Sequence, residues 1–290
     1  MIIDLHIHSK TCSDGNLSIE EIVQEAKARN IKLMSITDHD TIECQNQAKK
    51  SAENNGINYV NGVELNIRFT HPNFNQGKPI SLDLLGYKFD FCNKGLRRKL
   101  QEIIRYREKR LKKILENLNI EFKKEGISPL TEEDFTRIKN SVDGVLGRPH
   151  LADYLIRKNI VESRGEAFNR FLVKCNVPKY PLYLDKASNL LKDAGGIAIL
   201  AHPNDPYGTS LIKLTKNLQE QTSVIEDLML NHIDGIECWH SRNTAETTHH
   251  YHNFSKNHGL IMTGGSDCHQ NPIIMGTVKI PSFVALQFAT

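Results

Sequence analysis

The stretch MIIDLHIHSKTCSDGNLSIEEIVQEAKARNIKLMSITDHD (residues 1–40) decides the fold. Its β-rich run at residues 2–6 is followed by a helical pattern at 18–29 and a second β-rich run at 32–37. Ser18 and Glu21 have the spacing of a capping box, which marks where the first helix begins. The stretch therefore predicts a strand, a helix and a second strand, in the order of a βαβ unit.

The same alternation continues on both sides of a long helical region. A helical pattern at 41–54 and strand-like runs at 57–65 and 80–85 come first, and strand-like runs at 197–201, 235–239 and 260–263 with a helix at 244–258 come last. Residues 94–185 are instead helical, and the region opens with apolar residues at helical spacing from Leu96 to Leu118. We predict an α/β barrel-like domain, formed by residues 1–93 and 186–290, that carries an inserted helical cap lobe at 94–185.

Composition narrows the possible classes of protein. The chain has 290 residues, 39% hydrophobic and 24% charged, and it contains no apolar run that could cross a bilayer. No secretory signal is visible, so we expect a cytoplasmic protein without a membrane partner. A net charge of +3 argues against a dedicated nucleic-acid binder. Six scattered cysteines without a close pair indicate reduced thiols rather than a zinc ribbon or a disulfide scaffold.

Histidines and carboxylates stand at or near the ends of the predicted strands. They occur in Asp4-Leu5-His6-Ile7-His8, Thr37-Asp38-His39-Asp40, Gly62-Val63-Glu64, Ala201-His202-Pro203 and Ser266-Asp267-Cys268-His269, and Asp83 lies on a further strand. The carboxyl ends of parallel strands meet at one edge of an α/β fold, and strand alternation places His6 and His8 on the same face. Mixed imidazole and carboxylate ligands suit zinc, manganese or iron. The pattern thus predicts a transition-metal site.

In this order, the segments DLHIHSKTCSDG, SITDHD, GVE, LLGY, AHP and GSDCH resemble the polymerase and histidinol phosphatase (PHP) family over almost the whole chain. The segment Gly147-Arg148-Pro149-His150 resembles the subgroup with nucleoside bisphosphate phosphatases, phosphodiesterases and small exonucleases. The resemblance implies a distorted seven-stranded, TIM-like (β/α) barrel.

The resemblance also implies a trinuclear site with two to three divalent ions, manganese, iron or zinc. His6, His8, Glu64 and Asp267 would hold one ion. Glu64 would bridge to a second ion, held also by His202 and by Asp83, which stands where many relatives have histidine. A third ion would be held by Asp14, His39 and His269.

The same resemblance suggests Arg148 and His240 as contacts to phosphate. Relatives often have a phosphate-binding lysine where this chain has Val177, and Lys179 could take its place. His150 either contacts phosphate or caps the following helix. The run 94–113, with ten Lys or Arg and two Glu, is either a track for a nucleic-acid backbone or a solvated helix face.

We therefore expect a phosphoric ester hydrolase acting on a nucleoside bisphosphate or a short oligonucleotide through a metal-activated hydroxide. Glu64, Asp267 and His202 would act in catalysis through the metal ions. A histidinol-phosphate-type phosphatase and a metal-deficient PHP-like regulatory module remain alternatives. A serine hydrolase is discounted because no G-x-S-x-G motif is present. We expect no obligate protein partner.

Overall fold

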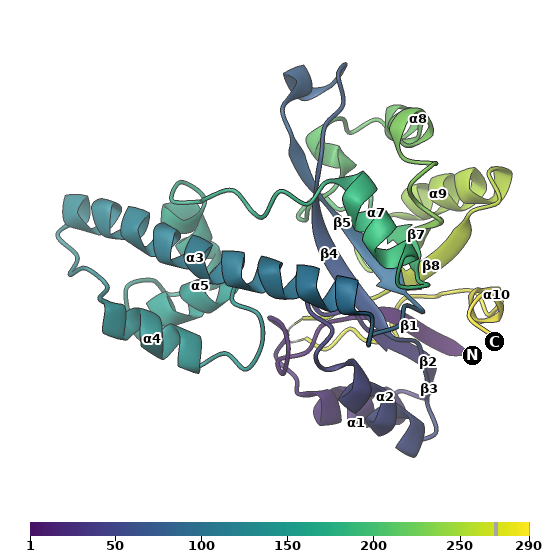
Figure 1. The fold of residues 1–290 in the computed structure, drawn as a ribbon, viewed down its shortest axis with the longest axis horizontal. Coiled ribbons are helices and arrows are strands. Elements are labelled where there is room, and N and C mark those ends of the chain that lie inside the picture. The colour runs from purple at the N-terminus through teal and green to yellow at the C-terminus, as the bar shows by residue number, and fades with distance from the viewer. Residues whose placement is uncertain (270–271, 290) are drawn as a thin grey trace.

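The strands of the computed structural model, which describes residues 1–269 and 272–289, form two sheets (Figure 1). The first is parallel and has the order β1 (Ile2–Ile7), β2 (Ile31–Ile36), β3 (Asn58–Tyr59). The second sheet is made, in spatial order, of β4 (Gly62–Phe69), β5 (Ile80–Tyr87), β6 (Ile197–Leu200), β7 (Gly235–His240) and β8 (Ile261–Gly265). The predicted α/β class is confirmed.

Strand β5 departs from the parallel pattern that the sequence suggested. It runs antiparallel to both β4 and β6, whereas β6, β7 and β8 are parallel. Asp83 therefore lies within β5, paired with Asn66 of β4, rather than after the carboxyl end of a strand. The single predicted strand at 57–65 is two strands, β3 and β4, separated by Val60 and Asn61.

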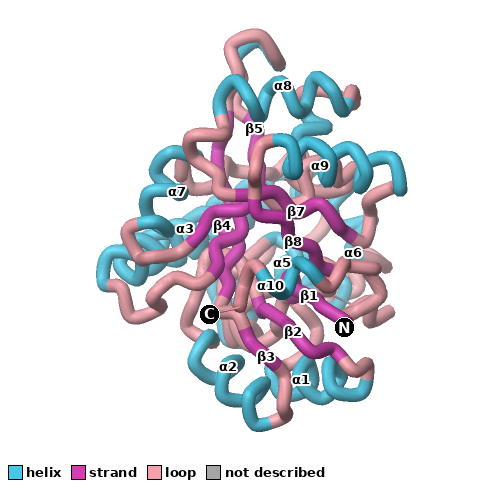
Figure 2. The backbone as a smooth tube through the Cα atoms, turned by 90° about the vertical axis from the view of Figure 1, so that its right-hand side faces the viewer, coloured by secondary structure: helices cyan, strands magenta, loops and turns pink. Residues whose placement is uncertain are grey.

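Backbone hydrogen bonds join the two sheets where the predicted site residues lie. The Asp40 amide donates to the Glu64 carbonyl at 2.8 Å, and the Asp267 amide donates to the His6 carbonyl at 2.8 Å. Figure 2 shows the strands gathered in the middle of the molecule with helices around them. The eight described strands thus form two sheets that these hydrogen bonds link.

The three helices predicted beside the sheets, at 18–29, 41–54 and 244–258, are present, and the described residues form three further helices there that were not predicted. Together they are α1 (Ile19–Ala28), α2 (Gln45–Asn54), α7 (Leu184–Lys192), α8 (Leu218–Leu228), α9 (Ala245–Asn257) and α10 (Phe283–Leu286), with short 3₁₀ turns η1 (Asn75–Gly77) and η3 (Leu211–Lys213). Ser18 and Glu21 form the predicted capping box of α1. Helix α2 begins four residues later than predicted.

The helical region extends away from the sheets (Figure 1). It consists of α3 (Lys94–Glu125), α4 (Glu132–Asn140), α5 (Arg148–Arg157), α6 (Arg164–Ala167) and the π-helical turn η2 (Phe168–Leu172). Its buried side chains, among them Phe122, Leu155 and Phe171, form a core of their own. The first turns of α3 belong to the main core instead, because Leu96 and Leu100 are buried against the sheets.

The expectation that all six cysteines are reduced was wrong for two of them. Cys12 and Cys44 form a disulfide across 32 positions of sequence, with their Cα atoms 6.2 Å apart. They are distant in sequence, but the parallel pairing of β1 and β2 brings the segments after these strands together. The other four cysteines are free. Within the described residues, no helix has both the length and the apolar character needed to span a membrane.

Candidate metal centre

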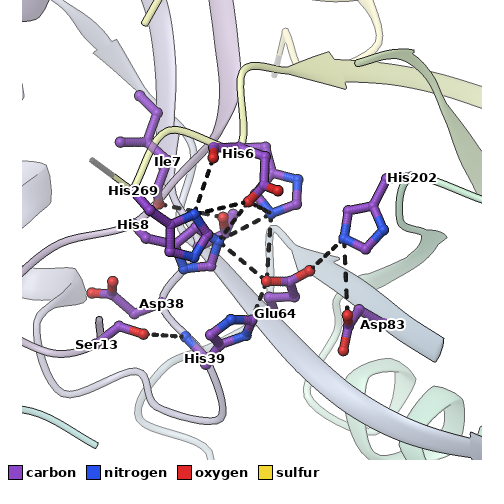
Figure 3. Close-up of polar contacts among 12 residues, drawn as sticks. His6, Ile7, His8, Ser13, Asp38, His39, Glu64, Asp83, His202 and His269 are labelled. Carbon is purple, nitrogen blue, oxygen red and sulfur yellow. Dashed lines mark hydrogen bonds and ion pairs between the residues drawn. The ribbon is translucent and has the colours of Figure 1, made fainter. Parts of the chain in front are cut away.

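The site is built around Glu64, whose side chain is buried among four imidazoles (Figure 3). Glu64 Oε2 lies 3.0 Å from His39 Nδ1, 3.1 Å from His8 Nε2 and 3.5 Å from His6 Nε2. Its other oxygen, Oε1, lies 3.0 Å from His202 Nε2. The Glu64 carboxylate on β4 is therefore in contact with histidines from the ends of β1, β2 and β6 or from the segments that follow them.

Asp267 and Asp14 extend the cluster on another side. Asp267 Oδ1 lies 3.3 Å from His269 Nδ1, 3.4 Å from His8 Nε2 and 3.5 Å from His6 Nε2. Asp14 Oδ1 lies 3.4 Å from His269 Nε2 and 4.0 Å from His39 Nε2. All the residues predicted from sequence as metal ligands, apart from Asp83, are thus within 4 Å of Glu64, Asp267 or Asp14.

Asp83 sits at the edge of the cluster. Its Oδ2 is 3.9 Å from His202 Nε2, while Oδ1 accepts a hydrogen bond of 2.6 Å from Asn66 and Oδ2 accepts one from the Thr209 hydroxyl. Burial and the nearby Glu64 carboxylate raise the pKa of Asp83. The structure therefore places Asp83 beside the cluster but gives it protein partners of its own.

The arrangement fits divalent metal ions. In three groups made only of histidines and carboxylates, the potential ligand atoms lie within 4.8 Å of one another: His8, Asp14, His39 and His269; His6, His8 and Asp267; and His6, Glu64 and His202. Glu64 Oε2 and His39 Nδ1 are both buried and face each other at 3.0 Å, yet neither has a hydrogen-bond partner. Buried polar atoms are rarely left unpaired, and a cation would satisfy both.

The electrostatics of the cluster agree with a cation-binding role. Burial would raise the pKa of Glu64, but His39 and His6 hold it well below the usual range. Burial would lower the pKa of His269, but Asp267 and Asp14 raise it well above the usual range. The carboxylates of the cluster thus attract positive charge strongly. Without a metal ion the imidazoles provide this charge by binding protons, and a bound metal ion would provide it instead.

Sequence reasoning missed two side chains that support the cluster. Glu237 is fully buried on β7, its Oε1 lies 3.0 Å from His6 Nδ1, and its Oε2 accepts a 2.8 Å hydrogen bond from the His202 amide. Arg242 donates to Asp205 at 2.5 Å and to Asp267 at 3.3 Å. A glutamate within an apolar strand was the available signal for Glu237, whereas no local pattern marked Arg242.

A cleft of about 860 Å³ opens onto the cluster. Five cationic side chains line it: Arg148, Arg164, Lys179, Lys213 and Arg242. Burial lowers the pKa of Lys179, and the Asp83 carboxylate opposes this effect. A cavity with this lining can accommodate an anion beside a metal centre. A larger groove of about 950 Å³ lies between α8 and α9, away from the cluster.

The predicted phosphate contacts fall in different places. Arg148 lines the cleft, donates to the Leu172 carbonyl at 3.2 Å and lies over the Phe168 ring. Lys179 also lines the cleft. His240 is buried with Nε2 3.5 Å from Asp267 Oδ2, outside the cleft lining. His150 Nδ1 accepts a 3.0 Å hydrogen bond from the Gly147 amide and so caps α5.

The basic run at 94–113 supplies no side chain to the described lining of the cleft. Several of its cations are engaged elsewhere: Arg107 pairs with Asp40 at 2.5 Å, and Arg110 donates to the Val177 carbonyl at 2.6 Å. The geometry therefore favours a structural role for these arginines, which connect α3 to neighbouring segments.

The fold and the cluster together define a class of α/β proteins that carry a buried cluster of histidine and carboxylate side chains with the spacing of metal ligands. Residues 4–175 match the PHP domain, and the chain belongs to the PHP domain family. The resemblance seen in the sequence is thereby confirmed.

Three known proteins show how far the likeness extends. A 5′-3′ exoribonuclease of Haemophilus influenzae is 33% identical over 207 residues, which cover 69% of this chain and 68% of that protein. A 3′,5′-nucleoside bisphosphate phosphatase of Chromobacterium violaceum is 27% identical and covers 92% and 87%. A solved structure from Bifidobacterium adolescentis, described as a metal-dependent phosphoesterase, is 25% identical with a TM-score of 0.80, covering 98% and 94%.

Proposed function

We propose that this protein is a metal-dependent phosphoesterase that hydrolyses a phosphate ester of a nucleoside bisphosphate or a short oligonucleotide. The observation that carries the proposal is the placement of a histidine and carboxylate cluster at the base of a cleft lined by five cations. Phosphate esters are anions, so this cleft offers both charge neutralisation and the site of reaction. Relatives that act on nucleotides and RNA support the substrate class.

We assign two to three divalent ions, manganese, iron or zinc, to the cluster of histidines and carboxylates. His6, His8, Glu64 and Asp267 would hold the first ion, and Glu64, His202 and Asp83 would hold a second. Asp14, His39 and His269 would hold the third. When bound, such ions neutralise phosphoryl oxygens and provide an activated water. Glu64, Asp267 and His202 are the residues whose loss would disrupt this chemistry most directly.

The remaining side chains bind the substrate or hold the ligands in place. Arg148 and Lys179 are assigned to the phosphate because both line the cleft. The planar guanidinium of Arg148 can donate two parallel hydrogen bonds to phosphate oxygens. Glu237 accepts a hydrogen bond from His6 Nδ1, so that Nε2 of the same ring faces the cluster. His240 and Arg242 both contact Asp267 Oδ2 and so help to orient this carboxylate.

We also propose that residues 1–93 and 186–290 together correspond to a distorted seven-stranded barrel, and that 94–185 form a cap. The hydrogen bonds between the two sheets support the first part. Arg148, Arg164 and Val173 of the helical region line the cleft, which supports the second. A cap in this position would help to exclude water from the phosphate.

The test is hydrolysis, with added manganese, of adenosine 3′,5′-bisphosphate, a short 5′-phosphorylated oligonucleotide and histidinol phosphate, with product identification and elemental analysis. Glu64→Gln should abolish turnover, and Glu53→Gln, an exposed glutamate on α2, should not. Turnover of histidinol phosphate alone would point to the alternative phosphatase. No turnover, with fewer than two ions bound, would point to a metal-deficient regulatory module.

A further inference from the structure

Tyr207 is an aromatic residue of the cleft lining that has no role in the site described above. Tyr207 lines the cleft and is 86% exposed, which makes it the most exposed large apolar side chain among the described residues. Scattered surface apolar residues are ordinary, so exposure alone proves nothing. The significance of Tyr207 depends on how it is held and on what lies beside it.

The backbone that carries Tyr207 is anchored by Asp205, which is buried. Asp205 Oδ1 accepts the Tyr207 amide at 2.9 Å, and its carbonyl accepts the Ser210 hydroxyl at 2.6 Å. Gly208 packs so tightly that a Cβ there would lie 2.3 Å from Asp205 Oδ2. The turn is therefore packed and hydrogen-bonded against the buried Asp205.

Both ends of this turn are tied to the metal centre. His202, at one end, lies 3.0 Å from Glu64, and the Thr209 hydroxyl, near the other end, hydrogen-bonds to Asp83. Asp205 is also bound to Arg242, which lines the cleft and contacts Asp267. The backbone that carries Tyr207 is thus hydrogen-bonded to a buried carboxylate that also contacts a cation of the cleft.

The chemistry of the surroundings matches a ligand with one flat apolar part and one anionic part. Within the described lining of the cleft, Tyr207 is the only tyrosine, phenylalanine or tryptophan, and Val173 is the other exposed large apolar residue. The five cations suit phosphate. A nucleotide has both features, because every nucleobase presents a π-face that stacks on an aromatic ring.

We propose that Tyr207 is the stacking surface for the nucleobase of a nucleotide whose phosphate is bound by the cations of the cleft. The inference rests on the proposed function and deepens it by assigning the residue that selects base-bearing phosphate esters. An aromatic ring recognises any base without reading its hydrogen-bonding edge. Selection should therefore favour nucleotides over sugar phosphates while discriminating weakly among the four bases.

The experiment compares Tyr207→Ala, Tyr207→Phe and the wild type on adenosine 3′,5′-bisphosphate and on ribose 5-phosphate, which has no base. Tyr207→Ala should raise KM for the nucleotide roughly 5- to 150-fold with little change in kcat, and should not alter KM for the sugar phosphate. Tyr207→Phe should match the wild type because it keeps the ring. Tyr183→Ala, an exposed tyrosine outside the cleft lining, is the control.

Calorimetric titration of both ligands in the presence of EDTA gives a readout that does not depend on turnover. Weaker nucleotide binding by Tyr207→Ala, with unchanged sugar phosphate binding, supports the inference even where hydrolysis is absent. Equal effects on both ligands, or none, would overturn it. A wild-type enzyme that hydrolyses nucleotides while Tyr207→Ala behaves identically would overturn the inference and leave the proposed function intact.

Discussion

At the scale of single residues, the cluster depends on side chains that do not themselves face the proposed ions. Glu237 is the clearest, because it contacts the His6 ring and the His202 backbone at once. Supporting carboxylates of this kind fix the orientation of a ligand imidazole and raise its basicity.

Glu237→Gln keeps the shape of this carboxylate but removes its charge. The affinity for manganese should therefore fall by about 10- to 100-fold while the fold is retained. Competition with a chelator measures the affinity, and circular dichroism checks the fold. An affinity equal to that of the wild type would show that Glu237 only fills the strand.

A second prediction at this scale concerns the role of Arg148 in binding phosphate. Arg148→Ala should raise KM and lower kcat, because the guanidinium would contact the phosphate in the ground state and in the transition state. Steady-state kinetics with the nucleotide substrate measures both constants. Arg157→Ala, at the other end of α5, is the matched control. Unchanged kinetics would assign Arg148 to its contacts with Leu172 and Phe168 alone.

At the scale of elements, the segments that follow β1 and β2 carry Asp14 and His39 and are tied by the disulfide between Cys12 and Cys44. A cross-link over 32 positions restricts the unfolded chain and should contribute about 3–4 kcal/mol to the free energy of unfolding. Urea unfolding with and without a reductant measures the loss. The double variant Cys12→Ser, Cys44→Ser should not respond to the reductant; an equal response in both proteins would refute the explanation.

Helix α4 carries a pH-dependent element. Burial would raise the pKa of Asp134, but hydrogen bonds from the Tyr154 hydroxyl and from Thr131 hold it well below its usual value. A depressed pKa means that the ionised form stabilises the folded state above the unfolded-state pKa of about 4, and that this contribution declines as the pH falls below it.

Asp134→Asn should therefore be less stable than the wild type at pH 7, and the difference should shrink towards pH 3. Urea unfolding of both proteins across this range measures it. A difference that stays constant with pH would assign the effect to packing or hydrogen bonding rather than to the charge.

At the scale of the whole molecule, the described residues form three hydrophobic cores, and α3 contributes to two of them, the main core and the core of the helical region. Phe171 is fully buried in the core of the helical region. Phe171→Ala should lower the stability of that region by about 3–5 kcal/mol, because it leaves a cavity. Hydrogen exchange should speed up from Leu111 to Cys175 while the amides of β6–β8 stay protected. Uniform loss of protection would show that the two cores unfold together.

The sequence by itself determined the order of the strands, the helical character of 94–185 and the family. These features depend on local periodicity, on capping residues and on motifs of a few positions. They can therefore be predicted without knowing which residues are close in space. Alternation along one strand likewise predicted that His6 and His8 share a face, and the resemblance to the PHP family predicted the rest of the cluster.

Only the tertiary structure decided the direction of β5, the pairing of Cys12 with Cys44, and the contacts of Glu237, Arg242 and Tyr207. In each case the partners are separated by tens to hundreds of positions or lie on irregular backbone. Their contacts arise from how whole elements pack, and the local sequence carries no periodic record of that packing. The shape and charge of the cleft, on which substrate choice depends, belong to this second group.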